Sequence, residues 1–151
     1  MKIHTETLEF NTEGWQVFVN ITDMIKKVVK DSNIKEGFVN IYTTHTTSCI
    51  KIMEHETMLI KDLEAFIERI APKSVTYYHD DLSKREVPPH ERINGHSHLK
   101  NFVGKTSEYI PISNNEMLLG EWQKIFFLEY DAGRKRKVIV QVIGNEQETL
   151  Y

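Results

Sequence analysis

The sequence is poor in cysteine and has no long hydrophobic run. Cys49 is the only cysteine among 151 residues, so the chain cannot form an intramolecular disulfide, and this is typical of proteins in reducing compartments. No stretch approaches the roughly 18 apolar residues of a membrane-spanning helix. The first ten residues alternate between polar and apolar and do not form the apolar block of a signal peptide. We therefore expect a cytoplasmic protein with no membrane contact.

Glycine, proline and excess positive charge are also scarce. With 7 Gly and 4 Pro, 40% hydrophobic and 27% charged residues, the composition is that of a globular protein. The net charge of −3 argues against a general nucleic-acid binder, which normally carries a basic excess. The basic run at residues 134–137 leads into an apolar strand, so a solvated strand edge is its favoured interpretation, with an anion contact as the alternative. We expect one domain covering residues 1–151.

Short β-prone segments make up most of the chain, and helical patterns interrupt them. The predicted strands are residues 3–10, 15–19, 38–43, 48–53, 107–112, 123–130 and 137–143. The last of these is dense in β-branched residues, which favours a central place in a sheet. A first apolar stripe at helical spacing begins after Asn20 and predicts a helix, which Asn20 or Thr22 would cap. A second stripe over residues 59–70 predicts another helix, which ends before Pro72. With a short helix after Gly95, the prediction is an α+β domain, mostly antiparallel sheet, with two or three helices.

Histidines gather in polar segments of the chain. There are seven in total, and His45 follows a strand, while His79 and the pair His96 and His98 lie at or near the long irregular segment 77–95. Loops of this length inside a compact domain are usually functional or disordered. Three segments that each supply an imidazole would suit a catalytic zinc site with one open position. The pair could share one ion in extended structure, but in a helix its members would diverge by about 200°. A chance pair of satisfied loop histidines is the alternative.

Other groups could complete such a site. Glu54 and Asp80 could orient an imidazole or act as a general base, although Glu54 could equally favour the dipole of the helix that follows it. The hydroxyls and N–H groups of residues 44–48 would suit an oxyanion or phosphate, or could simply form a polar turn. No glycine-rich phosphate loop or dinucleotide fingerprint is present.

The order and spacing of these motifs resemble the YjbQ-like family over nearly the whole chain. The matching stretches are residues 45–48 (His-Thr-Thr-Ser), Glu54, 62–63 (Asp-Leu), 78–81 (Tyr-His-Asp-Asp), 94–100 (Asn-Gly-His-Ser-His-Leu-Lys), 107–112 (Ser-Glu-Tyr-Ile-Pro-Ile), 119–125 (Leu-Gly-Glu-Trp-Gln-Lys-Ile), 134–136 and 140–144. The resemblance implies a β-sandwich-like α+β subunit that assembles into a homotrimer. It also implies a divalent metal, usually zinc, at His45, His79 and His98, with His96 as a fourth ligand or an acid–base neighbour.

Family members are associated with a weak, secondary thiamine-phosphate synthase activity, so the resemblance implies chemistry on a phosphorylated small molecule. Thr46, Thr47 and Ser48, with Arg92 or Lys100, would then receive phosphate, while the cation neutralises the leaving pyrophosphate. Glu54, Asp80 and His96 are the candidates for moving a proton. Two alternatives remain: a non-catalytic homotrimeric module that binds a small anionic metabolite through its metal, and a metal-dependent hydrolase.

Three departures from the family pattern bear on the substrate more than on the metal. Met53 stands where an Asn often precedes the motif glutamate, residues 114–116 replace an Asp-Gly turn, and Glu121 replaces a small residue before the tryptophan. None of the three involves His45, His79 or His98.

Overall fold

Two antiparallel sheets form most of the structure, a computed structural model that describes residues 1–146. The larger sheet has the strand order β1-β8-β3-β5-β6 and the smaller one β2-β7-β4, and every pairing is antiparallel. The strands are β1 Lys2–Asn11, β2 Trp15–Asn20, β3 Glu36–Thr43, β4 Ser48–Glu54, β5 Ser107–Ser113, β6 Glu116–Met117, β7 Gln123–Ala132 and β8 Lys135–Asn145. The helices are α1 Thr22–Ser32, α2 Thr57–Ile70 and α3 Gly95–Phe102, with short 3-10 helices η1 Tyr78–Asp80 and η2 Leu82–Lys84. This arrangement confirms the predicted α+β class.

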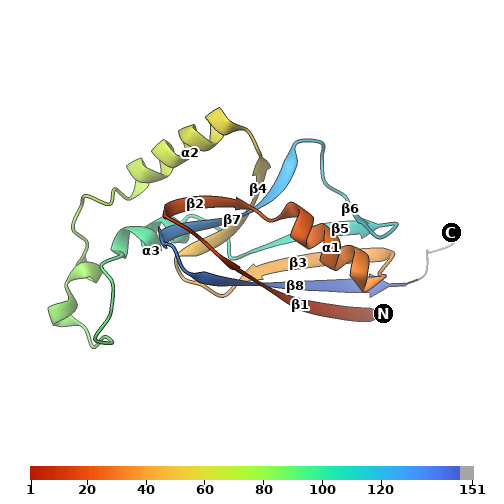
Figure 1. Cartoon of the computed structure of the whole chain (residues 1–151), viewed down its shortest axis with the longest axis horizontal. Coiled ribbons are helices and arrows are strands. Elements are labelled where there is room, and N and C mark those ends of the chain that lie inside the picture. Colours follow the sequence, from red (N-terminus) through yellow and green to blue (C-terminus); the bar gives the residue numbers. More distant parts are fainter. Residues whose placement is uncertain (147–151) are drawn as a thin grey trace.

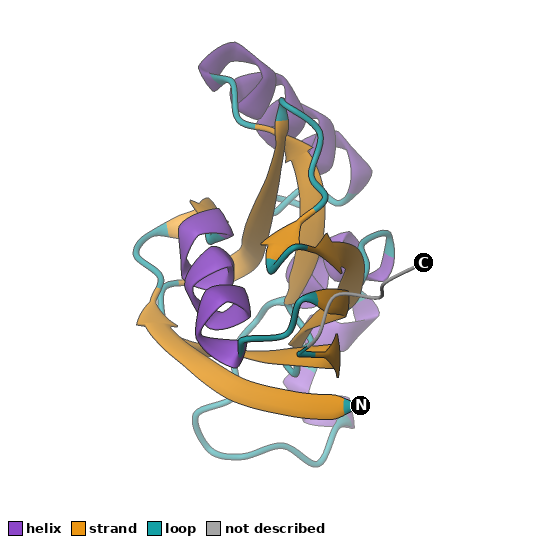
Figure 2. Ribbon diagram, turned by 90° about the vertical axis from the view of Figure 1, so that its right-hand side faces the viewer, coloured by secondary structure: helices purple, strands orange, loops and turns teal. Residues whose placement is uncertain are grey.

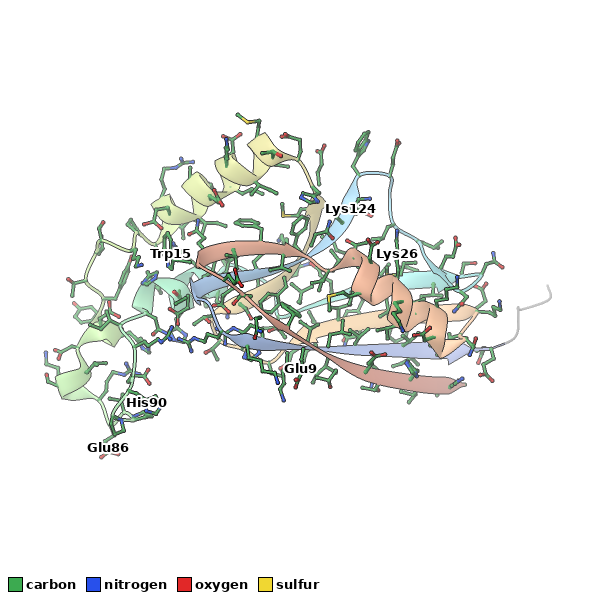
Figure 3. All side chains as sticks on the ribbon, viewed as in Figure 1. Glu9, Trp15, Lys26, Glu86, His90 and Lys124 are labelled. Carbon is green, nitrogen blue, oxygen red and sulfur yellow. The ribbon has the colours of Figure 1, made fainter. Side chains whose placement is uncertain are left out.

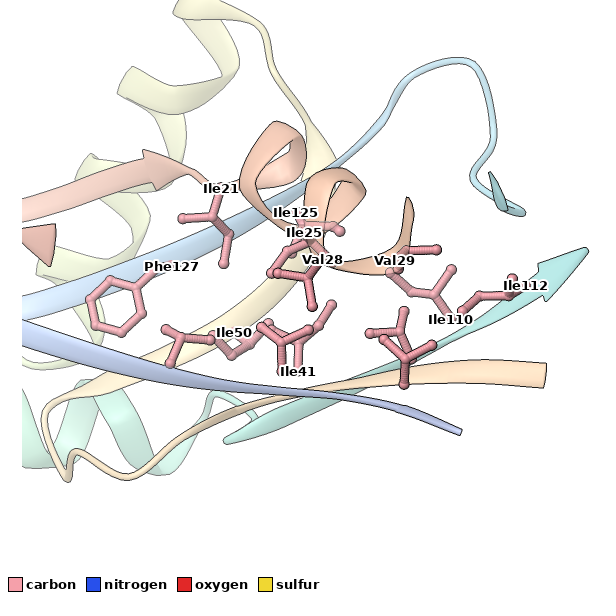
Figure 4. Packing of buried hydrophobic residues seen from close by; sticks show 14 of the residues in the cluster. Ile21, Ile25, Val28, Val29, Ile41, Ile50, Ile110, Ile112, Ile125 and Phe127 are labelled. Atoms are coloured by element: carbon pink, nitrogen blue, oxygen red, sulfur yellow. The ribbon is translucent and has the colours of Figure 1, made fainter. Parts of the chain in front are cut away.

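The main hydrophobic core lies between the two sheets and under α1. Alternate residues of β3 behave as the pattern predicts, because Val39 and Ile41 are buried while Phe38 and Tyr42 are exposed. Ile25 and Val28 of α1 pack into the same cluster, together with residues of β4, β5, β7 and β8 (Figure 4). The predicted central position of the last strand is confirmed, since β8 lies between β1 and β3.

Helix α2 differs from the other helices in how little of it is buried. The predicted helix is present, but Ile67 is its only buried residue, and the apolar side chains of Met58, Phe66 and Ile70 are exposed. In Figures 1 and 2 the helix stands at the margin of the molecule, beyond the strands. A small second cluster, formed by residues of β4 and β7 with Ile67, connects it to the smaller sheet.

The helix ends show how the sequence sets local boundaries. The N-cap position of α1 is Ile21, which cannot accept through its side chain, so the prediction that Asn20 or Thr22 is the cap is wrong. Asn20, one residue earlier, still accepts a hydrogen bond from the N–H of Thr22 at 3.0 Å. At the other end of α1, Asn33 adopts a left-handed conformation that stops the helix. Within residues 1–146, no helix combines the length and apolar character needed to cross a bilayer.

Candidate functional site

Three of the predicted histidine segments meet near one end of the molecule. The rings of His79, in η1, and His98, in α3, lie with their centroids 4.6 Å apart at an interplanar angle of 60°. The β3–β4 loop, which carries His45, approaches the same place, because the Thr46 backbone is close enough to His98 to influence its pKa. The structure therefore brings His79 and His98 together, with the His45 loop beside them.

His79 has a nitrogen that nothing in the described chain satisfies. Its Nε2 is buried and has no hydrogen-bond partner among residues 1–146. The backbone around it is fixed, since its carbonyl oxygen accepts a hydrogen bond from Arg85 Nη1 at 2.6 Å. A cavity of about 260 Å³, lined by residues 77–79, Gly95, His98 and Leu99, opens beside the two rings. A buried imidazole nitrogen without a partner is unusual, because leaving it unsatisfied costs about 1–3 kcal/mol.

The surroundings of His98 and His45 favour the neutral imidazole. Burial lowers the pKa of His98, and His79 lowers it further, against smaller opposing effects from the Thr46 backbone and Asp131. Burial also lowers the pKa of His45, and the cations Arg136, Arg134 and Lys137 add to this, partly offset by Glu129. Neutral imidazole is the form that binds a metal ion.

His45 does not reach the other two histidines in this conformation. Its Nε2 accepts a hydrogen bond from the backbone N–H of Lys137 at 3.0 Å. A neutral imidazole that accepts through Nε2 carries its proton on Nδ1, so neither nitrogen has a free lone pair. Among the residues that the structure describes, no three His, Cys, Asp or Glu side chains are arranged to hold a metal ion.

Asp80 ties two of the segments together. One of its carboxylate oxygens accepts from the N–H of Gly95 at 2.8 Å, and the other from the N–H of Tyr77 at 3.3 Å. It thus fastens η1 to the first turn of α3 and positions His79 against His98. Both oxygens are occupied by backbone donors, so the geometry gives Asp80 a positioning role.

The hydroxyls of the β3–β4 loop are divided between solvent and the interior. Thr46 is exposed, whereas Thr47 donates to Glu129 at 2.7 Å and Ser48 pairs with Thr43 at 2.8 Å. Arg136 Nη2 donates to Thr47 Oγ1 at 3.2 Å, and its Nε donates to Glu129. Thr46 is therefore the one predicted phosphate-binding hydroxyl that faces solvent.

Glu129 and Arg136 form a buried ion pair that sequence reasoning missed. The solvated interpretation of residues 134–137 is wrong for Arg136, which is buried, although Lys135 and Lys137 are exposed and pair with Glu9. Strand alternation was the available signal: Arg136 has the same parity as the buried residues Val138, Val140 and Val142 of β8.

His96 and Lys100 belong to a separate buried cluster. Because residues 95–102 are helical, His96 and His98 point in different directions, as the helical alternative predicts. His96 Nε2 accepts from Trp15 Nε1 at 3.3 Å, and Lys100 lies 4.6 Å above the Trp15 ring. Lys100 is fully buried and donates to Glu68 at 2.6 Å and to Gln16 at 2.8 Å. An anion could reach its ammonium group only if these contacts opened.

Two further predicted residues take different places. Glu54 is exposed at the far end of β4 from Ser48, about 20 Å along the strand. The structure does not bring it to the histidines. Arg92 is exposed in the segment before α3. It lies close enough to Asp131 to affect the pKa of that carboxyl. Burial raises this pKa, but hydrogen bonds from the backbone and from Asn94 outweigh burial, and Arg92 adds a smaller lowering effect.

Comparisons with known proteins agree with the fold. A family model described as UPF0047 protein YjbQ-like matches residues 6–145. A UPF0047 protein of Methanothermobacter thermautotrophicus is 33% identical over 144 residues, covering 95% of this chain and 94% of that protein. The Bacillus subtilis protein YugU is 26% identical over 92% of this chain and 98% of its own length. A crystal structure of a YbjQ-like protein of unknown function from Sulfolobus solfataricus superposes with a TM-score of 0.86 at 27% identity, over 95% of this chain and 99% of that one.

Proposed function

This chain belongs to the YjbQ-like UPF0047 family, and from that premise we propose that it is a metal-dependent protein that acts on a phosphorylated small molecule. The single observation that carries the proposal is the buried, unpartnered Nε2 of His79 beside the ring of His98. A buried imidazole nitrogen without a hydrogen-bond partner, beside a second imidazole ring, suits a divalent cation such as zinc better than it suits a hydrophobic core.

The donor set fits the proposed metal with one rearrangement. His79 and His98 would hold the ion, and His45 would be the third ligand after it leaves the Lys137 N–H. The backbone of Thr46, the residue after His45, already lies close to His98. When bound, zinc would supply the positive charge that polarises a phosphoryl oxygen or a leaving pyrophosphate.

Groups of the chain itself would orient the phosphorylated ligand. Thr46 offers an exposed hydroxyl, and Arg134 and Arg92 offer guanidinium groups near His45 and Asp131 respectively. The Arg134 side chain pairs with Asp131 but is about one-third exposed, so its solvent-facing donors are the ones that a phosphate could reach. Guanidinium groups present planar donors that match phosphate oxygens.

Thiamine-phosphate synthesis is the secondary activity that we propose on the family resemblance. The pyrimidine pyrophosphate loses pyrophosphate as the thiazole nitrogen attacks its carbon, so developing negative charge must be stabilised at the leaving group. The partly exposed cations near His45, Arg134 and Lys137, and the exposed Thr46 would stabilise that charge. Cytoplasmic location is part of the same proposal.

One observation favours a second candidate, a binding module without catalysis. Asp80 uses both oxygens on backbone donors, and Glu54 lies at the other end of β4. Neither of these predicted proton-transfer groups is free at the histidines. A protein that captures an anionic metabolite through its metal would need no such group.

We also propose that the subunits assemble as a homotrimer. Apolar side chains of α2 and α3 are exposed, namely Met58, Phe66, Ile70, Leu99 and Phe102. Several large apolar side chains exposed on neighbouring helical turns are candidates for a subunit interface. Only the resemblance to the YjbQ-like family indicates that the number of subunits is three.

Metal content tests the site directly. Purified protein is loaded with zinc, desalted and analysed for bound metal, and we expect about one ion per chain in the wild type, as for a single zinc site. His98→Ala should hold far less, because it removes one of two adjacent ligands. His55→Ala is the matched control, since His55 is an exposed histidine outside the site. Wild-type metal content in His98→Ala would contradict the assignment.

Turnover then separates the two candidates. Zinc-loaded protein is incubated with the pyrimidine pyrophosphate and the thiazole phosphate, before and after treatment with a chelator and after metal is restored. The enzyme is supported if thiamine phosphate forms with bound metal, no longer forms after chelation, and forms again when metal is restored. Metal binding without any product, including hydrolysed pyrophosphate, supports the binding module instead.

A further inference from the structure

A second cavity lies away from the histidines, between α1 and the chain that leads from β5 through β6 to β7. It has a volume of about 530 Å³ and shares no lining residue with the smaller cavity at His79 and His98. Figure 1 shows α1 and β6 towards one end of the long axis and α3 towards the other, and Figure 3 labels Lys26 and Lys124 beside α1. The two cavities are therefore separate sites.

Most of the charged residues that line this cavity are lysines, and we call it the lysine cavity. Lys26, Lys30, Lys35 and Lys124 line it, and Glu116 is the one carboxylate among its lining residues. The chain as a whole has a net charge of −3, so the positive charge at this cavity is opposite in sign to the net charge of the chain. Charges of one sign that line a hollow attract counter-ions more strongly than the same charges on a flat surface.

Most of these ammonium groups have no protein partner. Within residues 1–146, Lys30, Lys35 and Lys124 form no ion pair, and Lys26 only approaches Asp23 at 3.9 Å. By contrast Lys27, on the same helix, pairs with Asp31 outside the cavity. Lys35 and Lys124 are half-buried as whole residues, which restricts where their side chains can go.

The walls of the lysine cavity are held in place by hydrogen bonds. Asn114 and Asn115 form a tight turn between β5 and β6 with positive φ angles of 52° and 64°. The Asn115 side chain donates to the carbonyls of Val29 and Ile34, each at 2.9 Å, which fixes the turn to the end of α1. On the opposite side Gln123 accepts from the N–H of Gly120 at 2.9 Å. A preformed hollow loses little conformational freedom when a ligand binds.

We propose that the lysine cavity binds an organic diphosphate or a similar small anion with at least two negative charges. Its volume falls within the range of small-molecule sites. The lysines match phosphate oxygens, which ammonium groups bind as compact point charges. Val29, Met117 and Leu119 supply an apolar part of the lining for the organic portion of the ligand. This site does not depend on a metal and is independent of the function proposed for the histidines.

Calorimetric titration with adenosine diphosphate, without added metal and at low ionic strength, tests the proposal. Lys35→Gln with Lys124→Gln should weaken binding about 25-fold, roughly fivefold for each partly screened charge contact. Lys27→Gln with Lys61→Gln is the matched control, since it removes the same charge at exposed positions outside the cavity. The control should bind as the wild type does, and thermal melting should show that both double variants are folded.

The same titration with His98→Ala separates this site from the histidine site. We expect no change in affinity for adenosine diphosphate. In an NMR titration of the wild type, the amide chemical-shift changes on binding should centre on Asn115 and Gly120. Absence of binding to the wild type at millimolar concentrations, equal weakening in the control, or loss of binding in His98→Ala would each overturn the proposal.

Discussion

Replacing Arg136 by methionine should be among the most destabilising single changes in this chain. The side chains of Arg136 and Glu129 are 6% and 0% exposed, and Glu129 accepts from Arg136, from Thr47 and from the N–H of Asp131. Methionine keeps most of the arginine's aliphatic volume but leaves the carboxylate without its counter-charge. Breaking a buried ion pair by removing one partner costs about 3–5 kcal/mol, because the remaining charge stays out of water. We expect a loss of that size in the free energy of unfolding.

The measurement is urea unfolding at one protein concentration for all variants, so that any subunit association contributes equally. Lys137→Met is the matched control. It changes the next residue of the same strand, whose side chain pairs with Glu9 at the surface and whose backbone contact to His45 is unaffected. The control should shift the urea midpoint only slightly.

A second variant distinguishes an unpaired charge from a packing defect. Arg136→Met combined with Glu129→Gln removes both charges, and Gln retains an acceptor for the Thr47 hydroxyl and the Asp131 N–H. The double variant should recover at least about 2 kcal/mol of the loss, since coupling energies of up to 3 kcal/mol are found within such networks. The reasoning is refuted if Arg136→Met costs under about 1 kcal/mol, or if the double variant is no more stable than the single one.

Two further predictions concern acid sensitivity and assembly. Burial lowers the pKa of His96, His98 and His45 below the ordinary value of 6.5, so at lower pH the unfolded chain takes up protons that the folded chain does not. In chelator-treated protein the free energy of unfolding should therefore fall between about pH 7.5 and 5.5, and less steeply in His96→Gln; an unchanged slope would contradict this. Light scattering should give three times the chain mass of 17.7 kDa, whereas a monodisperse monomer would rule out the trimer.

Much of the fold could be predicted because the sheet residues follow simple periodicity. The alternation in β3 indicates the strand and which residues share a face, and the dense β-branched run in β8 indicates a strand inside the sheet. The two-residue strand β6 was missed, since it is too short to have a pattern. Its presence depends on the Asn114–Asn115 turn, where two left-handed residues reverse the chain.

Periodicity predicted α2 but not its burial. The spacing of Leu59, Leu63, Phe66, Ile67 and Ile70 gives an apolar face, and the helix is present. In the structure only Ile67 is buried. A repeat along one segment says which residues share a face, but it contains no information about what covers that face.

The candidate histidine site could be predicted only in part, because some of its contacts join residues that are far apart in the chain. The family resemblance implies that His79 and His98 lie together, and in the structure their ring centroids are 4.6 Å apart. The hydrogen bond that holds His45 at Lys137, and the burial of Lys100 against Trp15 and Glu68, depend on contacts between residues far apart in the chain. Such contacts leave no local pattern in the sequence.

The place of β8 in the larger sheet also bears on how the chain folds during synthesis. This strand joins β1 to β3, with Lys2 opposite Gly144 in the register. While the ribosome is still making residues 135–145, β1 has no partner, and a segment of ten residues must wait with its backbone groups unpaired. The smaller sheet can form as soon as β7 emerges. Both sheets therefore stay incomplete until the last two strands are made, a state exposed to wrong strand pairing.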